Sequence, residues 1–212
     1  MILYHEKGYI KMKVLNLYAG IGGNRKLWED VEVTAVEWVP EIAQIYRDFF
    51  PDDEVIETDA HPFLLENFQD YDFIWSSPPC PSHSRARFWS SRGGMYDPIY
   101  PDMSLYQEII LLDNYFKGKY CVENTVGYYE PLIKPQVVDR HYYWANFHIK
   151  RIKLKNRFNI QHNRIDNFEE TIGFDLSPYN NIDKKTVMRN CVDPRLGKHI
   201  LDCARDKIQT TL

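Results

Sequence analysis

The stretch KVLNLYAGIGG, residues 13–23, joins an apolar run to three closely spaced glycines. The apolar residues 13–18 predict a buried strand. Gly20, Gly22 and Gly23 allow the backbone to turn tightly and to approach a ligand, while the helix expected next would present free N–H groups. The stretch therefore predicts a nucleotide-like cofactor bound at the end of a first strand.

Strands and helices alternate along most of the remaining chain. Further strands are expected at 32–37, 54–58, 71–76, 119–123 and 140–146. Helices are expected at 24–30, 40–50, 61–68, 103–117 and 194–206. A long polar loop is expected between residues 76 and 103, and a loop-rich segment at 147–186. The alternation predicts an α/β fold with a mostly parallel, doubly wound sheet.

Two acidic residues end the second and third predicted strands. Glu37 lies 17 residues beyond Gly20, close to the spacing at which a carboxylate receives ribose hydroxyls in nucleotide-binding folds. Asp59 ends the next strand at the same edge of the sheet, where such ligands bind. Position 25 is Arg25, so the GxGxxG spacing is not met, and these residues alone leave NAD and S-adenosylmethionine both open.

A cysteine held between prolines follows the fourth predicted strand, in SSPPCPSHS, residues 76–84. Prolines fix φ, which predicts a rigidly placed Cys80 thiol at the same edge of the sheet. The nearby cations His83, Arg85 and Arg87 are expected to lower the pKa of this thiol. Glu123 follows the next strand, which would put a nucleophile and an acid in one pocket.

The composition predicts one soluble domain. With 212 residues, 44% of them hydrophobic, the chain can bury one substantial core. No apolar run approaches the roughly 18 residues that span a bilayer, and no signal-peptide pattern is visible. We therefore expect a cytoplasmic protein with no membrane association. The cysteines at 80, 121, 191 and 203 show neither metal-ligand nor disulfide spacing, and Cys121 and Cys203 are expected to be buried apolar residues.

The net charge of −4 hides an asymmetry. Residues 1–133 hold 11 Lys and Arg against 21 Asp and Glu, whereas residues 134–200 hold 13 against 7. The later segment is thus the better candidate to face phosphates, although a solvated basic surface would show the same charge.

Several of these stretches resemble motifs of the DNA (cytosine-5) methyltransferases, and they occur in that family's order. The resembling stretches are NLYAGIGG, the strand ends at Glu37 and Asp59, SSPPCPSHS, VENT and RNCVDPRLGKHI. The family's motifs usually read DLFAGIGG, PCQ and ENV. Asn16, Tyr18, Pro81 and Thr125 therefore depart from the pattern, while Cys80 and Glu123 keep its reacting groups. The chain resembles a short member of the family with a reduced target-recognition region.

The resemblance implies a Rossmann-like methyltransferase fold that binds S-adenosylmethionine. The implied cofactor-binding residues are Tyr18, Ala19, Gly20, Ile21, Gly22, Gly23, Glu37, Trp38, Asp59, Ala60, Pro78, Asn190 and Val192. Glu37 would bind the ribose hydroxyls and Asp59 the adenine amino group. Cys80 would add to C6 of a flipped-out cytosine while Glu123 protonates N3. Arg140 resembles the last arginine of the family's QxRxR motif, although Val138 replaces the middle arginine.

A DNA substrate is implied as well, with a role in DNA methylation such as restriction-modification. In the polar loop and beyond, the expected DNA-binding residues are Ser82, Ser84, Arg85, Arg87, Arg92, Lys153 and Lys155. Other residues able to contact DNA are Lys150, Arg151, Arg157, Phe158, His162 and Arg164. We expect a catalytic core at 12–146, a small DNA-recognition insert at 147–186 and a segment at 187–212 that returns to the core. The insert is short, so specificity could depend on a dimer or an accessory protein.

Three other functions stay open. Ser77-Pro78-Pro79 is similar to the SPP motif of amino methyltransferases, which would modify N4 of cytosine or N6 of adenine, although Cys80 replaces the expected aromatic residue. RNA cytosine-5 methylation is a second alternative. A catalytically silent cofactor-binding or DNA-binding module is the third.

Overall fold

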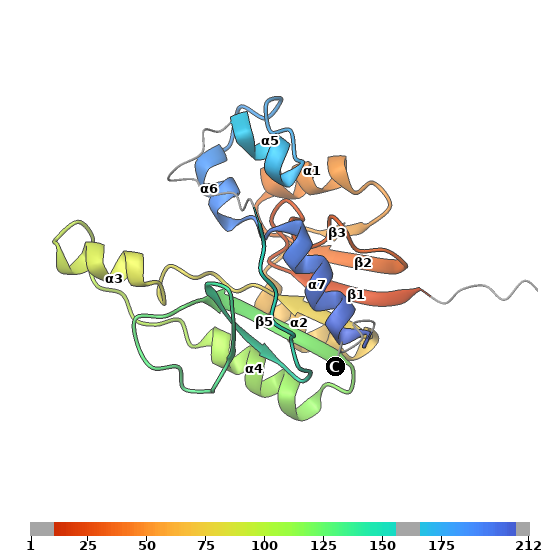
Figure 1. Cartoon of the computed structure of the whole chain (residues 1–212), viewed down its shortest axis with the longest axis horizontal. Helices are drawn as coiled ribbons and strands as arrows, with labels where there is room; N and C mark the ends of the chain where they lie inside the picture. Colours follow the sequence, from red (N-terminus) through yellow and green to blue (C-terminus); the bar gives the residue numbers. More distant parts are fainter. Residues whose placement is uncertain (1–10, 156–165, 207–212) are drawn as a thin grey trace, which may run out of the picture.

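A computed structural model describes residues 11–155 and 166–206, with side chains left undescribed at 166 and 167. Seven strands form one sheet in the order β3-β2-β1-β4-β5-β7-β6 (Figure 1). Their bounds are β1 Met12–Leu17, β2 Val31–Val36, β3 Glu54–Ile56, β4 Phe73–Ser76, β5 Lys119–Thr125, β6 Gln136–Val138 and β7 His141–Ala145. The first five strands are parallel, and β7 runs antiparallel to β5 and β6. The predicted α/β class and mostly parallel sheet are confirmed.

Residues 14–17 of strand β1 are buried on both faces, which explains their mostly apolar sequence. Val14, Leu15 and Leu17 are fully buried. The polar exception is Asn16, whose buried side-chain amide exchanges hydrogen bonds with that of Asn24 at 2.7 and 3.4 Å. This pairing satisfies two polar groups that would otherwise be costly to bury.

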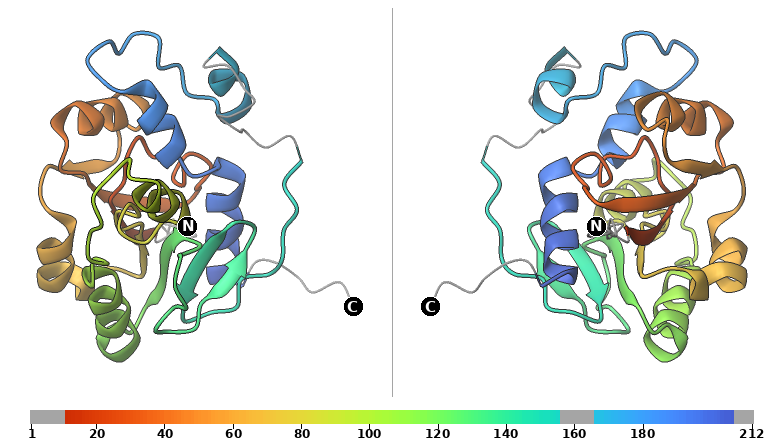
Figure 2. Two further views of the ribbon diagram at one scale, coloured as in Figure 1. Left: turned by 90° about the vertical axis from the view of Figure 1, so that its left-hand side faces the viewer. Right: turned by 90° about the vertical axis from the view of Figure 1, so that its right-hand side faces the viewer.

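Helices cover both faces of the sheet (Figures 1 and 2). Their bounds are α1 Pro40–Phe49, α2 Ala60–Asn67, α3 Arg85–Arg92, α4 Ser104–Tyr115, α5 Asp166–Ile172, α6 Lys184–Asn190 and α7 Pro194–Ala204, with a 3₁₀ turn at Phe68–Asp70. Side chains of α7 pack with Val14, Phe73 and Trp75 on one face, where α1 also lies. Side chains of α2 and α4 pack with Leu15 and Ile74 on the other. The result is a three-layer domain in which the helices leave the ends of the strands free to form a site.

Parts of the segment expected as an insert contribute to the core. An extended stretch after β7 carries Phe147 and Ile149 into the cluster beneath α7 (Figure 2). Further along, Phe168 and Ile172 of α5 form a third cluster with Ile45 of α1. The described parts of 147–186 therefore hold apolar contacts to both α7 and α1.

The structure corrects several expected elements. The helix expected at 24–30 is wrong: the chain there forms turns, in which Arg25 and Lys26 donate backbone hydrogen bonds to Gly22. The polar loop expected after β4 is interrupted by α3, because the Ser84 hydroxyl accepts a hydrogen bond from the Arg87 backbone N–H and caps a helix. Strand β6 and helices α5 and α6 were not expected. Weak local periodicity explains why these short elements escaped prediction.

The last strand also begins later than predicted. Strand β7 starts at His141 rather than Arg140, because Asp139 and Arg140 form the turn between β6 and β7. Asp139 has a φ of 56°, in the left-handed region that suits such a turn. No helix within 11–155 or 166–206 has the length and apolar character to cross a membrane.

Candidate active site

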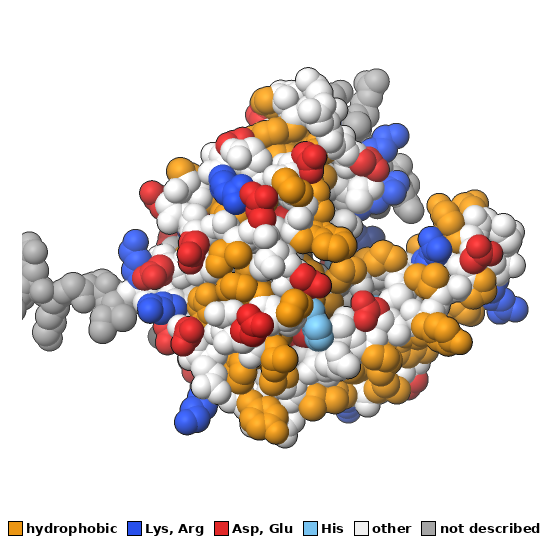
Figure 3. All heavy atoms as spheres, turned by 180° about the vertical axis from the view of Figure 1, so that it is seen from behind, with side chains coloured by type: hydrophobic (Ala, Val, Ile, Leu, Met, Phe, Trp, Pro, Cys, Tyr) orange, Lys and Arg blue, Asp and Glu red, His pale blue; other side chains and the backbone are white. Residues whose placement is uncertain are grey.

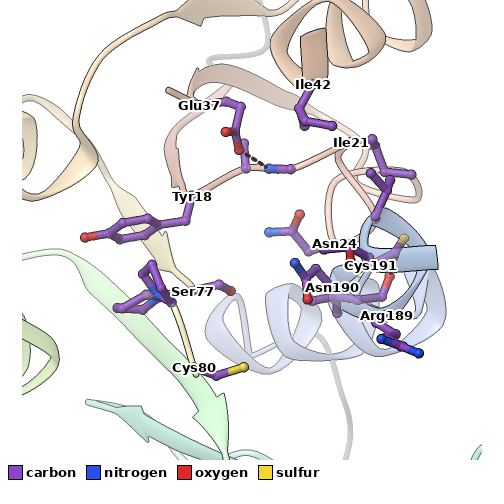
Figure 4. Close-up of a pocket in the computed structure, with 18 of the residues that line it drawn as sticks. Tyr18, Ile21, Asn24, Glu37, Ile42, Ser77, Cys80, Arg189, Asn190 and Cys191 are labelled. Carbon is purple, nitrogen blue, oxygen red and sulfur yellow. Dashed lines mark hydrogen bonds between the residues drawn. The ribbon is translucent and has the colours of Figure 1, made fainter. Parts of the chain in front are cut away.

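A cleft of about 1190 Å³ lies at the carboxyl ends of the parallel strands. Residues following β1, β2, β4 and β5 line it, together with the connection between α6 and α7. All predicted cofactor residues except Gly22 line this cleft, as do Cys80, Glu123 and Arg140. Figure 4 shows Tyr18, Glu37 and Cys80 around it. Residues expected from separate stretches of sequence are thus brought to one place.

The three glycines of the first turn do different things. A Cβ on Gly20, which has a φ of 55°, would meet no atom within 4 Å, so this residue faces open space. A Cβ on Gly22 would lie 2.3 Å from the Phe50 ring, and one on Gly23 would lie 2.4 Å from the Val192 carbonyl oxygen. Gly20 is therefore the glycine that leaves room for a ligand, whereas the other two permit close packing.

Glu37 holds the turn from the end of β2. Its Oε2 accepts a hydrogen bond from the Gly20 N–H at 2.9 Å, drawn as the dashed line in Figure 4, and its Oε1 accepts one from the Val39 N–H at 3.0 Å. Burial raises the pKa of this carboxyl, and those backbone hydrogen bonds oppose the rise. Carboxylate oxygens have further acceptor sites, so Glu37 can still receive hydroxyl groups.

Asp59 plays a structural part at the N-terminus of α2. Its carboxylate accepts a hydrogen bond from the His61 backbone N–H at 3.0 Å and so caps the helix. The residue remains exposed and lines the cleft. Its position is compatible with contact to a ligand.

The sheet places Glu123 beside the Cys80 loop. Ser76 at the end of β4 pairs with Val122 of β5, so the residues that follow them emerge together. The Asn124 side-chain amide donates a hydrogen bond to the Pro78 carbonyl at 3.0 Å and ties the strand to the loop. Asn124 is buried, which makes this tie rigid.

Residues 12–110 match the family model described as C-5 cytosine-specific DNA methylase. This segment is similar to that family. The match includes the glycine turn, Glu37, Asp59 and Cys80, and it ends within α4. Glu123 and Arg140, by contrast, lie beyond the part of the chain that matches the C-5 cytosine-specific DNA methylase model. No curated protein is similar enough in sequence to count as a match.

One solved methyltransferase structure shares the fold, and a second is similar over a shorter part of the chain. The Entamoeba histolytica methyltransferase EhMeth is 12% identical, with 94% of this chain and 99% of that chain covered and a TM-score of 0.54. A Spodoptera frugiperda DNMT2 mutant is 26% identical, with 54% of this chain and 36% of that chain covered and a TM-score of 0.38. The first similarity supports the methyltransferase fold. The second is too partial to add to it.

Within the segment that matches the family model, the environment of Cys80 differs from the sequence prediction. Burial raises the pKa of the half-buried Cys80 thiol, and the negative charge of Glu123 raises it further. The expected lowering by nearby cations is wrong. The His83 ring bonds to the Tyr129 hydroxyl at 2.6 Å, and Arg85 donates to a backbone carbonyl at 2.9 Å. His83 and Arg85 therefore bond to groups other than the Cys80 thiol.

One residue near Glu123 was missed by the sequence analysis. The His141 Nε2 lies 3.7 Å from the Glu123 Oε1, and the His141 Nδ1 is buried without a hydrogen-bond partner. Thr125 faces His141 in the β5–β7 register, while Glu123 faces Tyr143, so all four side chains share one face of the sheet. In the sequence, the only pattern that could have pointed to His141 is the alternation of side chains in HYYWA, residues 141–145. Arg140 itself is exposed at the preceding turn.

The carboxyl-terminal segment returns to the cleft, close to the glycine turn. Asn190 and Val192 line the cleft where α6 meets α7. Helix α7 approaches so closely that a Cβ on Gly197 would lie 2.2 Å from the Asn24 carbonyl oxygen. This close packing of the α7 backbone on the Asn24 backbone fixes the carboxyl-terminal segment against the glycine turn.

Ser82, Ser84, Arg85, Arg87, Arg92, Lys153 and Lys155, the predicted DNA-binding residues, do not line the cleft. Several of them belong to an arm that projects from the domain. This arm is formed by α3 and the residues up to Met103 (Figure 1). The Ser82 hydroxyl accepts a hydrogen bond from the Asp102 N–H at 3.0 Å, and Ser84 caps α3. These two hydroxyls hold the ends of the arm. The Arg87 guanidinium lies 4.1 Å from the Tyr96 ring centroid.

The arm presents many apolar side chains, seen at the right of Figure 3. The exposed ones are Trp89, Met95, Tyr96, Ile99, Tyr100 and Met103. The exposed Arg92, at the end of α3, lies over the rings of Phe88 and Trp89. Lys153 and Lys155 are exposed on the extended stretch after β7. Arg157, Phe158, His162 and Arg164 lie outside the described residues.

Proposed function

We propose that this chain transfers a methyl group from S-adenosylmethionine to C5 of cytosine in DNA. The observation that carries the proposal is the presence of Cys80 and Glu123 in the same cleft as the Gly20 turn and Glu37. A nucleophile, an acid and a nucleotide-type cofactor site at one sheet edge are the parts this chemistry needs. The family of residues 12–110 agrees with that reaction.

The cleft fits the proposed cofactor. The open space above Gly20 would admit a ligand next to the backbone, and Glu37 presents a carboxylate to it. The other residues proposed to hold it are Tyr18, Ala19, Ile21, Gly23, Trp38, Asp59, Ala60, Pro78, Asn190 and Val192. When bound, S-adenosylmethionine supplies an electrophilic methyl group. Gly22 would serve the turn indirectly, by letting α1 pack close to it.

Cys80 and Glu123 would carry the covalent chemistry. As the Sγ–C6 bond forms, the Cys80 thiol gives up its proton to the Glu123 carboxylate, and Glu123 passes a proton on to N3, which moves electron density to C5. After C5 gains the methyl group it gives up its proton to a base. The electron pair then restores the C5–C6 double bond and expels the Cys80 thiolate, and the N3 proton returns through Glu123 to the thiolate. Arg140, at the cleft, is proposed to orient the flipped-out base.

The remaining parts of the chain are assigned by the same proposal. Residues 12–146 form the catalytic and cofactor-binding part, 147–186 contribute to DNA recognition, and 187–212 close the cofactor site. The exposed Lys153 and Lys155 and the arginines of the arm would meet phosphates. A second copy or an accessory protein could extend the recognised surface.

Trapping on a fluorinated substrate tests the proposal. Duplex DNA containing 5-fluorocytosine blocks the final elimination, so the enzyme with S-adenosylmethionine should remain covalently attached. Intact mass and peptide mapping should place a methylated adduct on Cys80. The Cys80→Ala variant should form none, whereas Cys203→Ala, which removes a buried thiol on α7, should react like the parent protein.

Other outcomes would replace the proposal. Methyl transfer to ordinary DNA without any adduct would indicate transfer to an exocyclic amine. Transfer to RNA alone would indicate an RNA cytosine methyltransferase. Binding of S-adenosylmethionine without transfer to either nucleic acid would indicate a silent module.

A further inference from the structure

A buried carboxylate on α4 gathers hydrogen bonds from three other elements. The Glu108 Oε1 accepts from the Tyr18 hydroxyl at 2.6 Å and faces the His61 Nδ1 at 3.0 Å. Its Oε2 accepts from the Ser76 hydroxyl at 2.6 Å. Glu108 is only 1% exposed. Its carboxylate thus joins the glycine turn, the start of α2 and the end of β4.

Packing alone gives no reason for a carboxylate at this place. The neighbouring buried positions of α4 are apolar, including Leu105, Ile109 and Leu112. A buried charge loses its hydration, and an apolar side chain of similar volume is often as good or better for stability. The arrangement of the donors around Glu108 is therefore more informative than its contribution to the core.

Two of the three donors lie on the wall of the cleft. Tyr18 and His61 both line it, beside the proposed cofactor residues Gly20 and Asp59. The third donor, Ser76, precedes the loop that carries Cys80. Each Glu108 contact therefore ends at a segment that the proposed reaction uses.

Tyr18 needs such support because of its backbone. Its φ is 54°, in the left-handed region that non-glycine residues rarely adopt. A residue in that region keeps its conformation only when its surroundings hold it there. The hydrogen bond from the Tyr18 hydroxyl to Glu108 is such a restraint, and it fixes the ring relative to the cleft.

The protonation states agree with this arrangement. Burial raises the pKa of the Tyr18 phenol, and the Glu108 charge raises it further, so the hydroxyl stays a donor. The hydrogen bond to Glu108 raises the pKa of His61, whose Nε2 also faces the Gln107 Oε1 at 3.1 Å. Two oxygens thus face the two ring nitrogens of His61, as suits a ring that donates from both.

We infer that Glu108 is a positioning residue of the cofactor site, which fixes Tyr18 and His61 as a preformed wall for the nucleoside end of the cofactor. The inference rests on the proposed function, in that the cofactor is S-adenosylmethionine. Preformed walls favour binding because the ordering cost is met on folding rather than on association. Glu108 acts through its two partners and does not touch the ligand.

Calorimetric titration with S-adenosylhomocysteine tests the inference without any turnover. Tyr18→Phe and Glu108→Gln should each weaken binding by about tenfold, as expected for the loss of one hydrogen bond to a charged group. The double variant should bind about as weakly as Glu108→Gln alone, because the Tyr18 hydroxyl acts only through Glu108. Losses that simply add would mean that the two residues act separately, and would overturn the inference.

A matched control is available on the same helix. The Tyr106 hydroxyl of α4 accepts a hydrogen bond from the Leu132 N–H at 3.2 Å and does not line the cleft. Tyr106→Phe therefore makes the same chemical change away from the site, and its affinity should equal that of the parent. In transfer assays Tyr18→Phe should raise the KM for S-adenosylmethionine while the KM for DNA stays constant.

The outcomes separate the inference from the proposed function. If the parent protein binds S-adenosylhomocysteine and Tyr18→Phe and Glu108→Gln bind it equally well, Glu108 is structural and the inference fails alone. If Glu108→Gln does not fold, the comparison of Tyr18→Phe with Tyr106→Phe decides the matter. If the folded parent binds no S-adenosylhomocysteine, the proposed cofactor is wrong and the inference falls with it.

Discussion

Cys80 and Glu123 line one cleft from neighbouring strand ends, and the carboxylate of Glu123 adds to the rise in the pKa of the Cys80 thiol that burial causes. The thiol is therefore mostly protonated at neutral pH. The thiolate, its nucleophilic form, has to be generated as the substrate binds, because His83 and Arg85 are hydrogen-bonded to other groups. This relationship leads to the first prediction.

Glu123→Gln should make Cys80 more reactive towards alkylating reagents while it slows methyl transfer. The change removes a negative charge that raises the thiol pKa, so the thiolate fraction at neutral pH increases. Loss of the acid should lower kcat by about 10²-fold to 10⁴-fold. Iodoacetamide labelling across pH, quantified on the Cys80 peptide, measures the first effect. Glu130→Gln, at an exposed carboxylate, is the control, and an unchanged labelling profile in Glu123→Gln would contradict the prediction.

Cys80→Ala should abolish methyl transfer and leave cofactor affinity nearly unchanged. The side chain is proposed to bond only to the base, while Gly20 and Glu37 are proposed to meet the cofactor. Transfer of labelled methyl groups to DNA and calorimetric titration with S-adenosylhomocysteine measure the two properties. An alanine variant with parental turnover would exclude the covalent mechanism.

Gly197→Ala should destabilise the domain by about 1–3 kcal/mol, the usual cost of overpacking. The new Cβ would lie 2.2 Å from the Asn24 carbonyl oxygen, and neither the helix nor the turn can yield without moving backbone. Gly93→Ala is the matched control, because a Cβ there would approach no atom closer than 3.5 Å. Urea denaturation should separate the two variants; equal midpoints would mean that α7 shifts freely.

Arg92→Ala should weaken DNA binding and flatten its salt dependence. The slope of log K against log salt becomes shallower by about 0.9 for each phosphate that the protein no longer neutralises. Fluorescence anisotropy at several salt concentrations measures this slope. Arg47→Ala is the control, since Arg47 pairs with Glu57 at the end of α1 away from the arm. A slope equal to that of the parent would remove Arg92 from the DNA interface.

Much of the fold could be predicted because its signals are local. The apolar run before the glycines, the alternation of strands and helices, and the polar residues at strand ends all survive in the structure. The parallel order then brings Cys80 and Glu123 to one edge, as the strand positions predict. The short β6 and α3 escaped because a few residues carry too little periodicity to be recognised.

The sequence by itself determined the class of fold, the edge at which the site forms and the candidate nucleophile and acid, because hydrophobic periodicity and chain order are written residue by residue. Only the tertiary structure decided that Gly20, rather than Gly22 or Gly23, leaves space for a ligand. It also decided that the pKa of Cys80 rises, and that Glu108 reaches Tyr18 across 90 positions of sequence. Burial and side-chain direction depend on residues distant along the chain, and such contacts leave no local pattern to read.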